Sequence, residues 1–295
     1  MIEGINPVIY INAYMRLLRM NRLSIARYFI SLLVFMTTGT ATADEGKFSE
    51  ELFNLRYDPN QYSSQRVLEF WAYHDALEAQ NNSDILRLRY YQPLRFNQLR
   101  ATMRLDTTYV SNYGPTLPQH SYGSYSAGNT LLTVWGNHPD LMKYWGGTLG
   151  GRIVFPFGNN GQWAIGPQIG TVYRPPEGSK SPISDFSPLV RYMYGFDTKS
   201  NSFAKNPSQP PLVRNLNLFP TLGINITQNT QIRFWDENGI ILNTGGGGGW
   251  FVPLDAMVTH RLSKHFLFAV GASKQVVQSY AVYDWSIYGK VALNF

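Results

Sequence analysis

The segment "SIYGKVALNF", residues 286–295, decides the fold class. One set of alternate residues is apolar or small: Ile287, Gly289, Val291, Leu293 and Phe295. The other set is mostly polar or amphipathic: Ser286, Tyr288, Lys290, Ala292 and Asn294. A period of two predicts a β-strand with one apolar face. The strand alone leaves open whether that face meets a protein core or lipid.

The N-terminal region has the pattern of a secretory signal peptide. Arg22 and Arg27 precede an apolar run over residues 28–36, and small residues including Ala41 and Ala43 follow. The run is too short to span a membrane as a helix. We therefore expect residues 1–43 to be an N-terminal extension plus a cleaved signal peptide, with translation starting at Met1 or Met20. The alternative is a buried N-terminal helix. Residues 44–65 are expected to be a periplasmic segment, and residues 66–295 an outer-membrane barrel.

The composition favours a transmembrane β-barrel. Charged residues make up 15% of the chain, below the roughly 25% of soluble domains, and aromatic residues also make up 15%. After residue 43, no run of about 18 apolar residues could form a transmembrane helix. Residues 1–43 contain four arginines and one glutamate, so the rest carries 21 basic and 18 acidic residues. This balance predicts no nucleic-acid partner. An exported chain without cysteine must be stabilised by size, metal or membrane.

Strand-like segments of about 9 to 13 residues recur along the chain, as a tilted strand needs to cross a bilayer. Connections in bacterial barrels alternate between short periplasmic turns and longer outer loops. We expect short turns at 93–98, 227–230 and 261–265, and long outer loops at 111–124, 198–211 and 238–249. Two connections break this rule, because 158–162 would be a short outer loop and 174–185 a longish periplasmic one.

The strand count depends on residues 66–79. Eleven strands follow from residue 85, and "RVLEFWAYHDALEA" supplies a twelfth. Val67, Phe70, Trp71, His74 and Leu77 also have helical spacing, so a short helix is the alternative. We predict an all-β protein, a transmembrane antiparallel up-and-down β-barrel of about 12 strands.

Basic residues recur opposite the apolar faces of the predicted strands. A basic side chain facing lipid at mid-bilayer costs about 2–4 kcal/mol, so these residues should face the lumen. The lumen-lining candidates are Arg87, Arg89, Arg100, Arg104, Asp106, Arg152, Arg191, Arg233, Asp284 and Lys290. They predict a passage or pocket that prefers anionic or polarised aromatic solutes. Alternatively, the arginines only satisfy inward acids, backbone groups and water.

Catalytic and metal-binding patterns are weak. A lipid-modifying hydrolase needs serine and histidine with a third polar group. His120–Ser121 lies in an expected outer loop, and His260 with Ser263 lies at an expected periplasmic turn. Neither pair has an evident third partner. The glycines at 245–249 lack the Lys-Ser/Thr of a phosphate-binding loop. We expect no enzyme activity, no cofactor and no metal.

Tryptophans near the predicted strand ends suggest the aromatic girdles that membrane barrels place at the two interfaces. The residues are Trp135, Trp145, Trp163, Trp250 and Trp285.

Residues 85–295 resemble the meta-pathway phenol-degradation family of outer-membrane proteins. The resemblance rests on Gly128–Asn129 before a strand, the "IGP" strand at 165–167 and the "WFVPL" opening at 250–254. Asn129 stands where an aspartate is expected, and Gly289 where assembly signals often carry tyrosine. The resemblance implies a β-barrel channel, with some members encoded beside aromatic-degradation pathways, and it brings no catalytic residues.

These features predict an outer-membrane channel or transporter for small, aromatic or hydrophobic solutes. The expected partners are outer-membrane lipids, a small-molecule solute and the barrel-assembly machinery. Phe295, Leu293 and Val291 resemble the C-terminal signal that this machinery recognises. The alternatives are a lipid-modifying hydrolase and a non-conducting structural or surface-binding barrel.

Overall fold

The computed structural model describes residues 66–96, 99–116, 124–137, 147–157, 162–176, 179–198, 213–245 and 248–295. The expected signal peptide and periplasmic segment lie outside the described residues. His120, Ser121 and Trp145 also lie outside them.

Nearly all of the described chain is β-strand, with one short 3-10 helix, η1 (Glu78–Gln80). Within these ranges, no helix is long and apolar enough to cross a membrane. The strands are β1 (Val67–Ala76), β2 (Asn82–Phe96), β3 (Leu99–Tyr113), β4 (Ser126–Asn137), β5 (Gly147–Phe155), β6 (Gln162–Thr171), β7 (Ile183–Thr198), β8 (Arg214–Asn225), β9 (Thr230–Phe234), β10 (Ile240–Asn243), β11 (Gly249–Arg261), β12 (Phe266–Gln278) and β13 (Trp285–Asn294).

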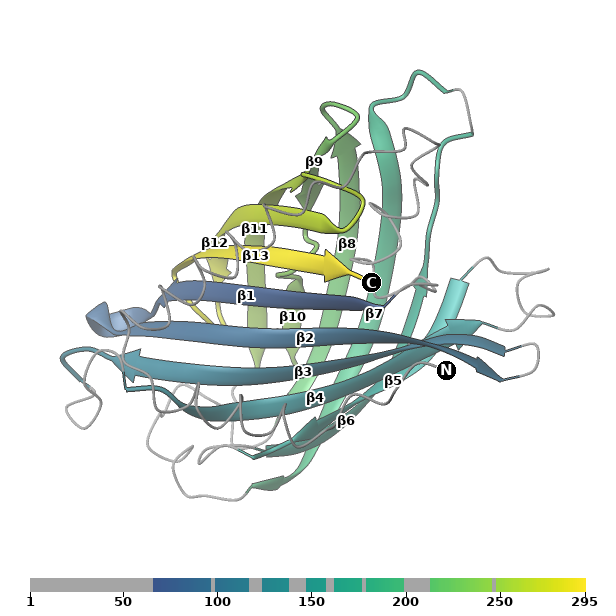
Figure 1. The fold of residues 1–295 in the computed structure, drawn as a ribbon. Coiled ribbons are helices and arrows are strands. Elements are labelled where there is room, and N and C mark those ends of the chain that lie inside the picture. Colours follow the sequence, from purple (N-terminus) through teal and green to yellow (C-terminus); the bar gives the residue numbers. More distant parts are fainter. Residues whose placement is uncertain are drawn as a thin grey trace, which may run out of the picture. The chain divides into compact units, whose positions relative to one another are not determined.

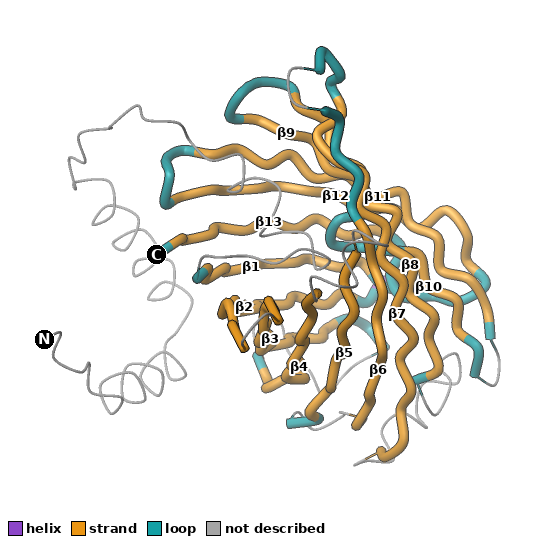
Figure 2. The backbone as a smooth tube through the Cα atoms, turned by 90° about the vertical axis from the view of Figure 1, so that its right-hand side faces the viewer, coloured by secondary structure: helices purple, strands orange, loops and turns teal. Residues whose placement is uncertain are grey.

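The strands form a closed antiparallel barrel (Figure 1). Apart from β9 and β10, strands that follow one another in the sequence are paired, and β13 pairs with β1, as Figure 2 also shows. β9 and β10 both pair with β8 on one side and β11 on the other. They therefore occupy one position in the wall, and the barrel has twelve strand positions. The predicted fold class is confirmed, and residues 67–76 form a strand rather than the alternative helix.

The wall is interrupted between β9 and β10. Phe234 pairs with Leu222 of β8, and Ile240 pairs with Leu218. The five residues 235–239 therefore lie opposite only three residues of β8. We call residues 235–239 the inward segment, because its Glu237 reaches across the barrel interior to β2. The prediction that residues 238–249 are a long loop was wrong in part, since β10 lies within that range.

Alternate residues separate into an outer apolar face and an inner polar face. On β13, Ile287 is 53% exposed, whereas Ser286, Tyr288 and Lys290 are buried. The same pattern exposes large apolar side chains around the barrel: Leu149, Ile165, Ile169, Leu254, Val258 and Val270. The alternation in residues 286–295 therefore separates the outside of a barrel from its inside.

The connections alternate between two ends of the barrel. The short connections at 226–229 and 262–265 lie at the end where β1 begins and β13 finishes, since successive strands are antiparallel. The connections at 77–81, 244–248 and 279–284 lie at the opposite end. The grouping of these connections agrees with the predicted alternation.

Apolar side chains also fill part of the interior. Val67, Tyr91, Trp135, Leu267 and Ala292 form one buried cluster near the end that holds the start of β1. Trp135 is 1% exposed, so its prediction as an interfacial girdle residue was wrong. Trp250 and Trp285 are about 40% exposed on the outer face, where a girdle residue belongs.

Candidate functional site in the barrel interior

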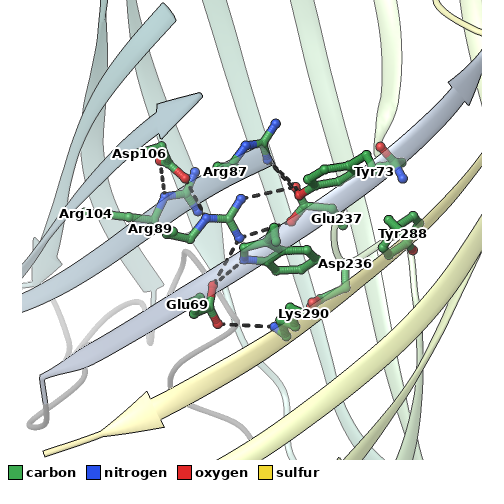
Figure 3. Close-up of polar contacts among 12 residues, drawn as sticks. Glu69, Tyr73, Arg87, Arg89, Arg104, Asp106, Asp236, Glu237, Tyr288 and Lys290 are labelled. Carbon is green, nitrogen blue, oxygen red and sulfur yellow. Dashed lines mark hydrogen bonds and ion pairs between the residues drawn. The ribbon is translucent and has the colours of Figure 1, made fainter. Parts of the chain in front are cut away.

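Charged side chains from four strands and the inward segment meet inside the barrel (Figure 3). We call this group the central cluster: Glu69, Arg87, Arg89, Arg104, Asp106, Glu237 and Lys290. β11, β12, β13 and β1 separate the inward segment from β2 along the closed sheet. Glu237 can therefore reach β2 only through the interior.

Asp106 holds two arginines. The Nε of Arg89 donates to one carboxylate oxygen at 2.5 Å, and the Nε of Arg104 donates to the other at 2.9 Å. Register explains the arrangement, because Arg89 on β2 pairs directly with Asp106 on β3. Arg104 stands two residues before Asp106 and shares its face. Charge-assisted hydrogen bonds of this kind are about twice as strong as neutral ones.

Glu237 ties the inward segment to β1 and β2. Its carboxylate accepts hydrogen bonds from Arg87 at 2.6 Å and from Arg89 at 3.1 Å to each oxygen. The Tyr73 hydroxyl also donates to it at 2.7 Å. The guanidinium of Arg87 lies 4.8 Å from the centre of the Tyr73 ring. These contacts brace opposite parts of the wall against each other.

Glu69 completes the cluster on the β1 side. It is fully buried and accepts hydrogen bonds from Lys290 at 3.3 Å, Arg89 at 3.4 Å and the Trp71 indole at 2.9 Å. Lys290 also lies 4.4 Å from the centre of the Trp71 ring. The cluster thus joins four cations to three carboxylates.

A second group surrounds Arg233 on β9. Arg233 makes a bidentate pair with Asp185 of β7, at 2.9 and 3.2 Å, and donates to Asp236 of the inward segment at 2.8 Å. Ser184 and Ser187 hydroxyls donate to Asp185 in turn. Asp236 therefore anchors the inward segment to its own side of the wall, while Glu237 anchors it to the opposite side.

Arg152 and Arg191 differ from the other interior arginines. Arg152 donates to the Thr133 hydroxyl at 2.9 Å, and Arg191 donates to the Gln168 amide oxygen at 3.0 and 2.8 Å. Among the described residues, neither guanidinium has a carboxylate within ion-pair distance. Within the described ranges, both cations donate hydrogen bonds only to neutral acceptors, and Arg191 also lies 5.6 Å from the centre of the Phe219 ring.

Two of the candidate positions lie away from the interior clusters. Arg100 is exposed at the beginning of β3. Asp284 lies one residue before β13, where its backbone NH donates to the carbonyl of Ala76. Neither position adds a charge to the central cluster.

The three proposed assembly-signal residues follow the outer phase of β13. Val291 pairs with Phe70 and Phe268, and Leu293 pairs with Leu68 and Phe266. Phe295 is 64% exposed beyond the strand, and its backbone NH donates to the carbonyl of Arg66. They form an apolar row across the seam between β12, β13 and β1.

Sequence reasoning named Asp106 among the lumen candidates but missed the other acids that pair with the arginines. Glu69 shares its face with Trp71 and Tyr73, so polarity does not alternate along β1. Asp236 and Glu237 lie in "WDENG", which has the Asp-Asn-Gly composition of a turn and was assigned in part to a loop. Asp255 is also fully buried, and it accepts hydrogen bonds from Tyr288 at 2.7 Å and Asn238 at 3.0 Å.

The described chain offers little for catalysis. His260 contacts the Thr230 hydroxyl at 2.9 Å and the Phe268 ring, rather than Ser263. Its strand phase places it on the outer face. No group of His, Cys, Asp or Glu residues within the described ranges could hold a metal ion.

Comparison with solved structures shows the fold. An outer-membrane channel from Pseudomonas putida F1 is similar at a TM-score of 0.58 and 10% identity, covering 78% of this chain and 95% of that one. The KdgM porin has a TM-score of only 0.43 and 8% identity over 78% of this chain and 99% of that one, and this likeness is too low to support a conclusion. No protein-family model matches the chain. No curated protein matches it either.

Proposed function

We propose that the protein is an outer-membrane channel for small solutes. The observation that carries the proposal is a charged inner face enclosed by an apolar outer face. The outer side chains suit lipid, which a closed barrel alone among β-structures can occupy. Buried ion pairs often stabilise a protein less than apolar packing of equal volume. A barrel that only had to be filled would therefore gain little from the central cluster, whereas a solute path needs polar walls.

The passage we propose is narrow. Asp106, Glu69 and Arg233 are fully buried, and Arg191 is 2% exposed. Water in a wide pore would reach such side chains. The contacts of Glu237 with β1 and β2 also cross the interior. We therefore propose small or intermittent conductance rather than the large steady currents of an open porin.

The decisive experiment is single-channel recording of the purified barrel in planar bilayers. We expect discrete, small conductance steps, together with slow uptake of small solutes in a liposome-swelling assay. Absence of both current and uptake would contradict the proposal. An empty bilayer treated with the same detergent is the control.

The burial of the interior favours one competing function, a non-conducting structural or surface-binding barrel. The apolar cluster around Tyr91 and Trp135, whose rings meet edge to face at 6.3 Å, supports it. This alternative predicts that the same recordings stay silent in every condition.

The finer assignments belong to the same proposal. The order of motifs between residues 85 and 295 supports membership of the phenol-degradation family and hence aromatic or hydrophobic solutes. The signal-peptide pattern supports export to the outer membrane of a Gram-negative bacterium. The apolar row Val291, Leu293 and Phe295 supports recognition by the barrel-assembly machinery, and the outer face supports contact with outer-membrane lipids.

A further inference from the structure

Arg152 and Arg191 stand out because their charges lack a counter-ion among the residues that the structure describes. Arg87, Arg89, Arg104 and Lys290 share the carboxylates of Glu69, Asp106 and Glu237, and Arg233 has two of its own. A buried charge is costly unless it is paired. Arg191 is buried and Arg152 partly buried, and in the described chain their hydrogen bonds go only to an amide oxygen and a hydroxyl; Arg191 also lies 5.6 Å from the centre of the Phe219 ring.

Register brings the two arginines to one part of the inner wall. Arg152 of β5 pairs with Gly166 of β6, and Gln168, two residues further along β6, pairs with Arg191 of β7. Gly166 presents no side chain between them. A Cβ there would clash with Met193 Sδ and the Tyr192 carbonyl oxygen, so the position excludes any larger residue.

An unused donor lies at the same place. The oxygen of the Gln168 amide accepts both hydrogen bonds from Arg191. Its Nε2 is buried and has no hydrogen-bond partner. A buried donor without a partner costs about 1–3 kcal/mol. In the part of the chain that the structure describes, the two guanidinium groups and the unpaired amide NH2 of Gln168 have no negatively charged acceptor.

The carboxylate of Asp106 is already occupied by other arginines. Asp106 acts electrostatically on both Arg152 and Arg191, but its two oxygens accept hydrogen bonds from Arg89 and Arg104. Arg152 and Arg191 also repel each other and are repelled by Arg104. An anion entering this region would relieve that repulsion.

We propose that Arg152, Arg191 and Gln168 bind the carboxylate group of a small organic anion. A guanidinium presents two parallel NH donors that match the two oxygens of a carboxylate. The Gln168 amide supplies a further donor. The inference deepens the proposed channel function, on which it rests for the entry of solute, by naming a carboxylate as the group recognised inside the barrel.

The test measures propionate binding to the purified barrel in detergent by isothermal titration calorimetry, without any membrane. We expect Arg152→Gln and Arg191→Gln each to weaken binding about tenfold, the value of one charge-assisted hydrogen bond. Arg100→Gln, at an exposed position, is the matched control and should bind as the wild type does. Equal binding by wild type and both variants would overturn the proposal. Equally tight binding of inorganic phosphate would overturn its carboxylate specificity.

Stability separates binding from a structural role. If the arginines bind ligand, Arg191→Gln removes an uncompensated cation and should raise the unfolding temperature without propionate. The same change should also abolish the increase in unfolding temperature that propionate causes in the wild type. If instead they brace the wall, Arg191→Gln should lower that temperature, which would contradict the inference. Arg191→Lys keeps the charge but loses the two parallel NH donors of the guanidinium, so this variant should bind propionate more weakly than the wild type does.

Bilayer recordings distinguish this inference from the channel proposal. A wild-type barrel that binds propionate but never conducts would support the carboxylate site and contradict the channel proposal. A barrel that conducts but binds no propionate would support the channel proposal and contradict the carboxylate site.

Discussion

At the scale of residues, the interior arginines form two classes. Those of the central cluster and Arg233 have carboxylates from neighbouring strands or the inward segment, whereas Arg152 and Arg191 have neutral acceptors. The two hypotheses made from the sequence, an anion-preferring passage and arginines satisfied by inward acids, therefore apply to different residues. We expect the paired arginines to brace the wall, and we propose Arg152 and Arg191 as the ones that bind a solute.

Glu237→Gln tests the bracing. The change leaves Arg87 without its carboxylate and removes one partner of Arg89. Breaking a buried ion pair from one side costs about 3 kcal/mol, so the free energy of unfolding in denaturant should fall by that amount. Glu78→Gln, in the exposed η1 turn, is the control and should leave the free energy unchanged. Equal stability of the two variants would show that the cross-barrel contact does not brace the fold.

The lumen candidates chosen from the sequence include several arginines and one of their partners, Asp106, but not Glu69, Asp185 or Glu237. Alternation assigns a residue to a face because the side-chain period of a strand is two. It cannot tell which strands face each other across the interior. The pair of Arg233 with Asp185 joins residues 48 positions apart, and that of Arg87 with Glu237 joins residues 150 apart. The Arg87–Glu237 pair follows from barrel closure, which a single strand does not encode, whereas the Arg233–Asp185 pair spans β8, since both residues pair with Gly223.

At the scale of elements, the inward segment is the main departure from a regular barrel. Trp235 adopts a left-handed backbone conformation with φ of 50°. Its indole NH donates a hydrogen bond to the Pro253 carbonyl at 2.8 Å. The Thr221 hydroxyl donates to the Trp235 carbonyl at 2.9 Å. The segment is therefore fixed at its first residue as well as through Asp236 and Glu237.

Deleting Glu237 and Asn238 should restore a continuous strand. Four positions separate Leu222 from Leu218 on β8, and six separate Phe234 from Ile240. Removing two residues equalises the spacing and keeps the alternation of faces, so β9 and β10 can join. We expect an assembled barrel with larger single-channel conductance than the wild type. Unchanged conductance in a correctly assembled variant would show that the inward segment does not narrow the passage.

Gly239→Ala probes the return of the segment to the wall. An added Cβ would lie 2.6 Å from the Leu218 carbonyl oxygen and 2.7 Å from the Phe219 ring. The backbone must shift, and overpacking of this kind costs about 1–3 kcal/mol. We expect a lower unfolding temperature on heat-modifiability gels. Gly151→Ala meets only the Gly166 carbonyl oxygen at 3.4 Å and should be tolerated.

Element boundaries were predictable where turn chemistry and strand alternation agreed. The turn at 262–265 separates two clearly alternating strands and was found. β1 was ambiguous because large aromatic residues occupy its inner face. The "DENG" sequence carried a turn signal, but its position inside the barrel depends on Arg233, Arg87 and Arg89, which lie elsewhere in the chain.

At the scale of the whole molecule, apolar residues surround the barrel instead of forming one core. Exposed side chains such as Ile165, Leu254 and Val270 come from different strands and share the outer phase. A soluble protein rarely exposes so extensive an apolar surface. The low charge content and the alternating strands predicted this arrangement from sequence, because both are typical of a wall with an apolar outer face and a polar inner face.

The depth dependence of charge on that surface tests whether the barrel spans a membrane. Val270 lies in the central part of β12, paired with Val258 and Gly289, and is 57% exposed. Val276 is 59% exposed but lies two residues from the end of the strand. In lipid vesicles, Val270→Arg should lower the free energy of unfolding by about 2–4 kcal/mol, and Val276→Arg should lower it by about 0–1 kcal/mol. Water would hydrate both arginines equally, so similar, small losses would show that β12 does not cross a bilayer.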